Sequence, residues 1–458
     1  MMSLMAVLLL LLQPAAAGAA ADARQMSLRD HPIAASAAPV YLDGAAWTAS
    51  TLPPPGADAR QQQQQQQRLP PPPRINMTVA ASVPGDLITD LQRAAVIADP
   101  WLDTTWIGQA SLWSDHAWTY TTHFAVSEAA AVAAKGTGQA TAATALLLVL
   151  DGVKMGATVR VNGHTVGLVR DQFLRYVFTL DPAELGLVAG QNRLDVTFGV
   201  GDVAEDGRFM ACTGGWDWAP YSYTSTNSSG ETSGPAVTFS KGIWKSVYLV
   251  EVPAATLAIT HVTPHTHYMG AYPTARLADG EHGGFAVNVT AHLWAPSGGA
   301  TGMLSVAGSW TASGDGGGES SGAGVASSSE LLTLPAGSSK VSLQLTATAN
   351  QIKLWWPSGV GAQPLYNVTA TWAPAEAAAA AAAAVAGGGG GGATVTATRR
   401  IGFRVFALVT VNDTNTTIVA SNASKQVTGQ ANDTGTHGMF FRVNGAPIYS
   451  RGANMIPM

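Results

Sequence analysis

Residues 216–218 combine a carboxylate with two indole rings, the arrangement in this chain that is best suited to contact a sugar. They form Trp216-Asp217-Trp218 within Gly215-Trp216-Asp217-Trp218-Ala219-Pro220. A carboxylate accepts hydrogen bonds from sugar hydroxyls, while an indole face covers the apolar face of a sugar ring. The same residue types also suit a structural role, in which Asp217 holds the amides of a β-turn and both tryptophans lie in the core. The residues alone leave both interpretations open.

Two other groups of ionisable residues are less suited to chemistry. His261, His265 and His267 lie close together, but alternate positions along a strand are typical of an exposed face rather than a metal site. The acidic group at residues 202–206, before Arg208, is typical of a solvated loop. No phosphate-binding glycine loop and no Gly-x-Ser-x-Gly elbow occurs in the sequence. We therefore expect neither a metal site nor a cofactor.

The composition favours a neutral ligand. Asp, Glu, Lys and Arg make up only 12% of the 458 residues, and the net charge is −5. Because no long basic run is present, neither nucleic acid nor an anionic membrane surface is expected as a partner. The length allows two to four domains at roughly 100 to 200 residues each. The only cysteine, Cys212, excludes an intrachain disulfide and is expected to be packed rather than nucleophilic.

The elements that must position these residues are predicted to be strands. Leu146–Leu150 has the composition of a buried strand, and Ala157–Val161 alternates between apolar and polar residues. Asn162-Gly163 favours a two-residue hairpin turn, after which Thr165–Leu168 returns. A helical pattern is clearest from Asp86 to Ala95. The sequence thus predicts an all-β chain of packed sheets, either a sandwich or a jelly roll.

Low-complexity segments interrupt this pattern. Residues 52–73 are rich in Pro and Gln, residues 308–329 in Gly and Ser, and residues 375–392 in Ala and then Gly. Such segments cannot build a packed core, so we expect surface loops there, although the alanines could form a short exposed helix. None of them carries residues suited to chemistry.

The N-terminus indicates the secretory pathway. An apolar run at residues 4–12, followed by small residues, resembles a signal peptide at residues 1–21, although the usual positive charges before the run are missing. The run is shorter than the roughly 20 residues that a membrane-spanning helix needs. N-glycosylation sequons support the same compartment and occur at Asn76, Asn227, Asn288, Asn367, Asn412, Asn415, Asn422 and Asn432.

Short motifs spread over residues 83–458 also occur in a particular order. They are Val83-Pro84-Gly85-Asp86, Asp99-Pro100-Trp101, Trp118-Thr119-Tyr120, the hairpin from Val159 to Gly163, Trp216-Asp217-Trp218-Ala219-Pro220, Gly242-Ile243-Trp244-Lys245, Leu354-Trp355-Trp356-Pro357, Ile401-Gly402-Phe403-Arg404 and Arg451-Gly452-Ala453-Asn454-Met455-Ile456-Pro457. Together they resemble the β-mannosidases of glycoside hydrolase family 2. Ala219 departs from the resemblance, since the family has glycine in its Trp-Asp-Trp-Gly-Pro signature.

The resemblance implies a jelly-roll sugar-binding domain, an immunoglobulin-like β-sandwich and then a (β/α)8 barrel in which two glutamates perform retaining hydrolysis of terminal β-D-mannosides. Only the first barrel strand, roughly Ile448 to Met455, is expected in this sequence, whereas a barrel needs about 250 residues. No catalytic glutamate can be assigned, and we expect the chain alone to be inactive. The implied boundaries are 1–21 for the signal peptide, 22–78 for an N-terminal segment with the Pro/Gln-rich insertion, 79–252 for the jelly roll, 253–410 for the sandwich, and 411–458 for a linker and the start of a truncated barrel.

The resemblance also implies substrate contacts. In the family a jelly-roll loop reaches over the barrel mouth and its acidic residue contacts the terminal sugar, which favours Asp217 as a contact, with Trp216 and Trp218 beside it. Asn454 is expected near the C-terminal end of the first barrel strand, the edge where barrel active sites form, and Arg451 is expected to position it or to pair with an acid.

Several functions fit the resemblance. The first is a β-mannosidase, secreted or vacuolar/lysosomal, whose partners are β-mannosides such as N-glycan or mannan fragments. Related specificities in the family are β-galactosidase, exo-glucosaminidase and endo-β-mannosidase. A different class is a non-catalytic carbohydrate-binding protein that consists of the two β domains alone.

Overall fold

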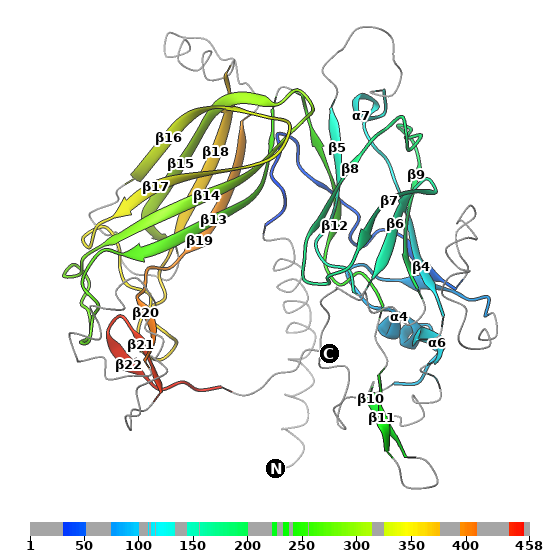
Figure 1. The fold of residues 1–458 in the computed structure, drawn as a ribbon, viewed down its shortest axis with the longest axis horizontal. Coiled ribbons are helices and arrows are strands. Elements are labelled where there is room, and N and C mark those ends of the chain that lie inside the picture. The colour runs from blue at the N-terminus through cyan, green and yellow to red at the C-terminus, as the bar shows by residue number, and fades with distance from the viewer. Residues whose placement is uncertain are drawn as a thin grey trace, which may run out of the picture. The chain divides into compact units, whose positions relative to one another are not determined.

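The computed structural model contains two compact units. The first includes Ala37–Pro253, and the second includes Ile33–Ser36 and Ala254–Asn454. The structure describes residues 31–51, 75–99, 109, 111–114, 116–132, 144–154, 156–199, 222–226, 232–237, 241–254, 256–313, 325–375, 394–409 and 439–452. Within these ranges nearly every element is a strand and all pairings between strands are antiparallel, so the predicted all-β fold is confirmed (Figure 1).

The first unit contains two main sheets. The larger has the strand order β3-β2-β4-β9-β6-β7 and the smaller the order β1-β12-β5-β8. Their bounds are β1 Val40–Tyr41, β2 Trp47–Ser50, β3 Thr78–Ala81, β4 Trp118–Phe124, β5 Ala145–Leu150, β6 Ala157–Val161, β7 His164–Val169, β8 Tyr176–Leu180, β9 Asn192–Phe198 and β12 Val247–Val252. Inward side chains of both sheets form one core, in which Trp118, Tyr120, Leu148, Val159 and Val196 are fully buried. This arrangement fits a galactose-binding-like jelly roll.

The hairpin of β6 and β7 forms where the sequence predicts it. Asn162 and Gly163 occupy the turn with φ of +48° and +86°, the left-handed conformation that Asn and Gly tolerate best. The predicted strands Leu146–Leu150 and Ala157–Val161 are β5 and β6, respectively, so both are confirmed.

The predicted helix between Asp86 and Ala95 is α4, which spans Leu87–Arg93. Asp86 caps it, because its Oδ1 accepts a hydrogen bond from the Thr89 amide at 3.1 Å, an interaction generally worth about 1 kcal/mol. The other described helices of the first unit are short, and a separate hairpin precedes β12. They are α6 Ser111–Ser114 and α7 Glu128–Val132, and the hairpin consists of β10 Ser222–Thr226 and β11 Thr232–Val237.

The second unit is an immunoglobulin-like sandwich of two sheets. Their strand orders are β13-β14-β17 and β16-β15-β18-β19. The bounds are β13 Ala258–Tyr268, β14 Phe285–Ala295, β15 Ala300–Ser313, β16 Val325–Leu334, β17 Gly337–Ala347, β18 Leu365–Pro374 and β19 Val395–Ile401. The core between them includes Phe285, Trp310, Tyr366, Trp372 and Phe403, each at most 1% exposed. Burying a large apolar side chain of this kind stabilises the fold by roughly 1.5–3 kcal/mol.

One predicted loop is partly wrong. The Gly/Ser-rich composition of residues 308–329 predicts a surface loop, but β15 continues to Ser313 and β16 begins at Val325. The two strands pair in register from Ala300 with Leu334 to Ser309 with Val325. Both strands therefore continue into the Gly/Ser-rich range, because backbone pairing between strands needs no large side chain.

A third, small sheet joins the second unit. It has the order β20-β21-β22, with bounds Phe406–Val409, Phe440–Val443 and Ala446–Ile448. Both β21 and β22 fall in the range 411–458, for which a linker and the start of a barrel are expected. They lie within the second unit, and Val443 belongs to its core. The exact domain boundaries stay predictions.

Among the described residues, no helix combines the length and the apolar character needed to cross a membrane. The proposed signal peptide lies outside the described residues.

Candidate functional site

Most of the predicted substrate contacts lie outside the described residues. These are Trp216, Asp217, Trp218 and Asn454. Arg451 is described and is exposed to solvent after β22. The structure therefore neither brings these residues together nor separates them. The described residues that flank the segment between β9 and β12 show how that segment is held.

Lys241 fixes the C-terminal end of that segment. Its side chain is only 4% exposed, and its Nζ donates a hydrogen bond to the carbonyl of His116 at 2.6 Å. The Lys241 carbonyl accepts a hydrogen bond from the amide of Leu87, the first residue of α4, at 2.8 Å. The segment that contains residues 216–218 thus ends against the beginning of a helix. Sequence reasoning missed Lys241, although an isolated lysine just before Gly242-Ile243-Trp244 was a visible signal.

The motifs at residues 83–86 and 242–245 contact each other directly at this point. The Gly85 amide donates to the Ile243 carbonyl at 2.8 Å. Gly242 has φ of +147°, and a Cβ atom at this position would lie 2.7 Å from the Cα of Asp86. Glycine is therefore required at position 242 for both its backbone conformation and the close approach of Asp86. The motifs at 83–86 and 242–245 build a structural junction.

Lys154 brings a third segment to this junction. Its Nζ forms an ion pair with Asp86 Oδ2 at 2.7 Å, and its amide donates to the Gly242 carbonyl at 2.8 Å. The side chains of Lys154 and Asp86 are 12% and 23% exposed, so the pair is largely shielded from water. Asp86 thus caps α4 with one oxygen and binds Lys154 with the other.

A buried carboxylate connects the same region to the core. Asp90 of α4 is 1% exposed and accepts hydrogen bonds from the Ser82 amide, the Tyr120 hydroxyl and Arg93, each at 3.0 Å. Burial raises the pKa of Asp90 above its ordinary value, while these partners act in the opposite direction. Burial, and next the charge of Asp90, raises the pKa of Tyr120 well above its ordinary value. Asp90 has no solvent access through which to act as an acid or base, so its role is structural.

The tryptophan of the Gly242-Ile243-Trp244 motif is also engaged. Its Nε1 donates to the Gln172 carbonyl at 3.0 Å, and the Lys245 ammonium lies 4.4 Å from the ring centroid. Phe173 contacts the indole edge to face at 6.4 Å and is 48% exposed. A Cβ atom on Gly152 would lie 2.8 Å from Trp244 Nε1, so this ring packs directly against backbone.

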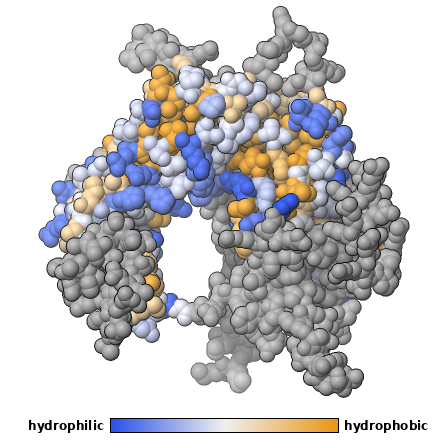
Figure 2. Space-filling model, viewed as in Figure 1, coloured by the Kyte–Doolittle hydropathy of each residue, from blue (hydrophilic) through white to orange (hydrophobic). Residues whose placement is uncertain are grey.

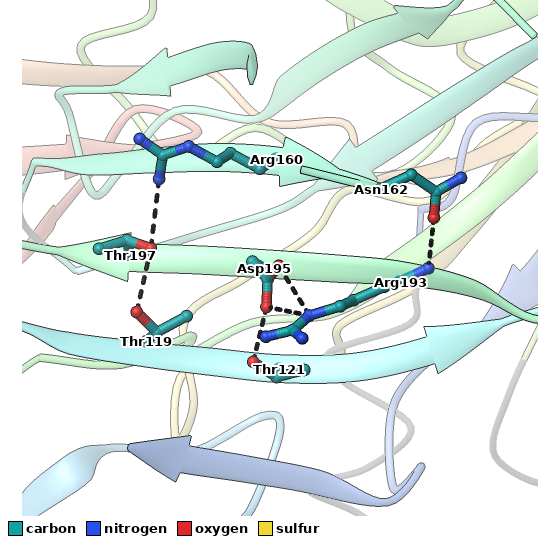
Figure 3. A network of polar contacts seen from close by, with 7 residues as sticks. All are labelled: Thr119, Thr121, Arg160, Asn162, Arg193, Asp195 and Thr197. Carbon is teal, nitrogen blue, oxygen red and sulfur yellow. Dashed lines mark hydrogen bonds and ion pairs between the residues drawn. The ribbon is translucent and has the colours of Figure 1, made fainter. Parts of the chain in front are cut away.

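A polar network covers the outward face of β4, β9 and β6 (Figure 3). Asp195 is 1% exposed and accepts from Thr121 Oγ1 at 2.6 Å and from Arg193 Nε at 2.9 Å. Thr197 continues the network, since its hydroxyl contacts Thr119 at 3.1 Å and accepts from an Arg160 guanidinium nitrogen at 3.4 Å. These partners satisfy the buried carboxylate and hold three strands in register.

Asn444 forms the corresponding junction in the second unit. It is fully buried in the turn between β21 and β22, and its Nδ2 donates to the Trp355 carbonyl at 2.9 Å. Its Oδ1 accepts from the Val405 amide, also at 2.9 Å. A Cβ atom on Gly445 would collide with the Ala275 carbonyl oxygen. The Asn-Gly turn therefore locks the hairpin onto three other segments of the sandwich.

The adjacent tryptophans of the second unit are stacked against cations. The Arg404 guanidinium lies 4.5 Å from the Trp355 ring centroid, and that of Arg276 lies 4.1 Å from the Trp356 ring centroid. Trp356 is 6% exposed. These motif residues hold the sandwich together and offer little free ring face to a ligand.

Three of the predicted glycosylation sequons are described. Asn76 and Asn288 are exposed, whereas Asn367 is half-buried in β18. The other five asparagines, at 227, 412, 415, 422 and 432, lie outside the described residues.

Residues 59–230 match the family described as "Glycosyl hydrolase 2 galactose-binding domain-like". β-Mannosidase A from Aspergillus terreus is 26% identical over 417 residues, which cover 84% of this chain and 37% of that protein. β-Mannosidase A from Aspergillus niger is 25% identical over 443 residues, which cover 90% of this chain and 40% of that protein. The chain thus spans about two-fifths of the length of these relatives.

Solved structures show the same fold. β-D-Mannosidase from Dictyoglomus thermophilum superposes with a TM-score of 0.50 at 18% identity, over 92% of this chain and 40% of that one. An exo-chitosanase from Amycolatopsis orientalis gives a TM-score of 0.50 at 16% identity, over 91% and 37% of the two chains. Residues 59–230 are therefore similar to the N-terminal galactose-binding-like domain of glycoside hydrolase family 2, and most of the chain shows distant homology to β-mannosidase A.

Proposed function

We propose that this chain is the N-terminal, substrate-contacting part of a β-mannosidase that hydrolyses terminal β-D-mannosides with retention of configuration. The observation that carries the proposal is the extent of the homology, which covers 84–90% of the chain and so includes the sandwich as well as the sugar-binding domain. A similarity limited to the sugar-binding domain would support carbohydrate binding alone.

The two described units are proposed to lack hydrolytic activity by themselves. Retaining hydrolysis needs two carboxyl groups about 5–5.5 Å apart beside the glycosidic bond. The carboxylates of Asp86, Asp90 and Asp195 are each held by a cation or by hydroxyl and amide donors. Incubating the chain with an aryl β-mannoside should release no aryl alcohol above a blank. Release that persists after repurification, and that substitutions in the chain abolish, would refute the proposal.

The specificity can be tested on a longer form of the protein that includes a barrel with two glutamates. The relatives are about two and a half times as long as the part that they share with this chain. The longer protein should turn over aryl β-mannosides with a higher kcat/KM than the matching β-galactosides or β-glucosaminides. A preference for one of the latter would assign a related specificity of the family instead.

Within that protein, Asp217 is proposed to contact the terminal sugar, with Trp216 and Trp218 covering its apolar face and with Asn454 and Arg451 as further contacts. An Asp217→Ala change should lower kcat/KM on mannosides by at least about tenfold, because a hydrogen bond to a charged group generally contributes about 1.5–3 kcal/mol. Asp206→Ala is the matched control, since it removes a carboxylate from the same segment. Equal effects of the two changes would argue for a structural role of Asp217.

Carbohydrate binding without catalysis is the second candidate, and the description of the matched family favours it. Calorimetric titration of the chain with mannobiose, galactose and chito-oligosaccharides distinguishes a non-catalytic binding protein from part of a β-mannosidase. Binding to the isolated chain would support a self-sufficient binding module. If mannosides bind only to a longer protein with a barrel, the site is shared with the barrel and the first proposal holds.

Localisation in the secretory pathway is also a proposal, which rests on the resemblance of residues 1–21 to a signal peptide and on the sequons. Expression in a eukaryotic host should yield a chain that begins after residue 21 and loses mass on deglycosylation. An uncleaved, unglycosylated chain would contradict it.

A further inference from the structure

The outward face of β13, β14 and β17 is rich in imidazole. Register pairing and the two-residue period of strands place one set of side chains on this face. Its members are His261, Thr263, His265 and His267 on β13, Ala286, Asn288, Thr290 and His292 on β14, and Lys340, Ser342, Gln344 and Thr346 on β17. None of these residues is an acid. Figure 2 shows hydrophilic residues gathered over these strands.

The two ends of the face differ in charge. At one end the ring centroids of His261 and His292 lie 5.9 Å apart. Lys340 lies opposite His292 in the register, and a guanidinium nitrogen of Arg399 of β19 lies 3.4 Å from His261 Nδ1. Burial, and next the charge of Lys340, lowers the pKa of His292. A divalent cation at this end would meet two fixed positive charges, so it is disfavoured.

The other end carries the remaining two histidines of this face. His265 and His267 are both exposed, and their rings lie nearly parallel, 6.3 Å apart at 21°. Together with Asn288, Thr290, Ser342, Leu343 and Gln344 they line a depression of about 490 Å³. Hydrogen bonds of 3.2 Å from Gln344 to Asn288 and of 2.8 Å between Thr290 and Ser342 hold its floor.

We propose that His265 and His267 chelate a divalent transition-metal ion of the zinc, copper and nickel class, with water in the remaining positions. Neutral imidazole is a preferred ligand of these metals at a nitrogen–metal distance of about 2.0–2.1 Å. Both rings are exposed and their centroids are 6.3 Å apart, so the proposal requires side-chain rotation that brings one nitrogen of each ring to a common point. The amide and hydroxyl groups of the floor can accept hydrogen bonds from metal-bound water. The alternate spacing that typifies an exposed strand face thus also provides a bidentate site.

The test uses the untagged chain, produced without N-glycosylation so that Asn288 in the depression stays unmodified. Competition for Zn²⁺ with a chromogenic chelator gives the affinity, and the electron paramagnetic resonance spectrum of bound Cu²⁺ reports nitrogen ligands. His265→Ala or His267→Ala should each weaken Zn²⁺ binding at least about tenfold, because loss of even an outer-shell partner typically costs 10–100-fold. Binding should also weaken in acid, since protons compete with the metal for imidazole.

The matched control is the double variant His261→Ala/His292→Ala, which removes two histidines from the same face. It should leave Zn²⁺ affinity and the Cu²⁺ spectrum unchanged, and unchanged thermal transitions in all variants exclude loss of folding as the cause. Unaltered binding in a His265→Ala/His267→Ala variant, or equal losses in both double variants, would overturn the proposal. Either result leaves the carbohydrate function untouched, because the site shares no residue with the proposed sugar contacts.

Discussion

Replacing Asn444 by alanine should destabilise the second unit alone. The change removes the side-chain hydrogen bonds to the Trp355 carbonyl and the Val405 amide, both of 2.9 Å, at a position with no solvent exposure. Each unsatisfied buried group generally costs about 1–3 kcal/mol. Alanine at φ of +48° adds about 1 kcal/mol of backbone strain. The expected loss in free energy of unfolding is about 3–7 kcal/mol.

Differential scanning calorimetry can detect this loss. For a unit of this size, about 1 kcal/mol lowers Tm by roughly 2–4 °C, so one of two transitions should fall by roughly 6–28 °C. Asn444→Gly separates the causes, because glycine removes the hydrogen bonds but tolerates the left-handed conformation. It should retain about 1 kcal/mol more stability than the alanine variant.

Asn162 provides a reciprocal control in the first unit. It has the same φ of +48° in an Asn-Gly turn, and its Oδ1 accepts a hydrogen bond from the Arg193 amide at 2.8 Å. Asn162→Ala should lower the other calorimetric transition and leave that of the second unit in place. If Asn444→Ala shifted neither transition by more than 1–2 °C, or shifted the same one as Asn162→Ala, the proposed anchoring role of Asn444 would be wrong.

Three further changes probe the junction of the first unit. Gly242→Ala should prevent the junction from packing, because the new Cβ would lie 2.7 Å from the Cα of Asp86. Gly190→Ala is the control, because no atom lies close to a Cβ there, and it should change Tm by less than 2 °C. Similar Tm shifts in the two variants would contradict this prediction. Lys154→Met should cost about 3 kcal/mol in urea denaturation, since it leaves the shielded Asp86 carboxylate without its cation, and the double change Lys154→Met/Asp86→Asn should recover part of the loss. Burial raises the folded-state pKa of Asp90, so the folded state binds a proton at this carboxyl more tightly than the unfolded chain does. The stability contributed by this proton is fully present below the unfolded-state pKa and is lost as pH rises through the folded-state pKa. The Tm of wild type relative to Asp90→Asn should therefore rise on acidification from pH 7 towards 4, and a constant difference would argue against it.

Local pattern was enough to predict several elements. The apolar run of β5, the alternation of β6 and the Asn162-Gly163 turn each act through neighbouring residues, so their structure follows from the sequence. Asp86 as the beginning of a helix is a similar case, because a cap acts on amides only a few residues away.

Residues of the candidate site were harder to predict because their roles depend on distant partners. Asp86 and Lys154 are separated by 68 residues, and Lys241 and His116 by 125. The motif at Gly242-Ile243-Trp244 resembles that of a known family, but its close contact with Asp86 depends on the packing of the fold. The proposed contacts Asp217 and Asn454 stay predictions.

The sequence by itself determined the all-β class, the main hairpin and the resemblance to a glycosidase family, because strand period, turn chemistry and motif order are local properties of the chain. Only the tertiary structure decided which motifs form junctions, and that the identical Asn-Gly turns at 162 and 444 differ in burial. The physical reason is that burial and hydrogen-bond partners are set by segments far apart in sequence, such as those of Trp355, Val405 and Asn444, which no local pattern records.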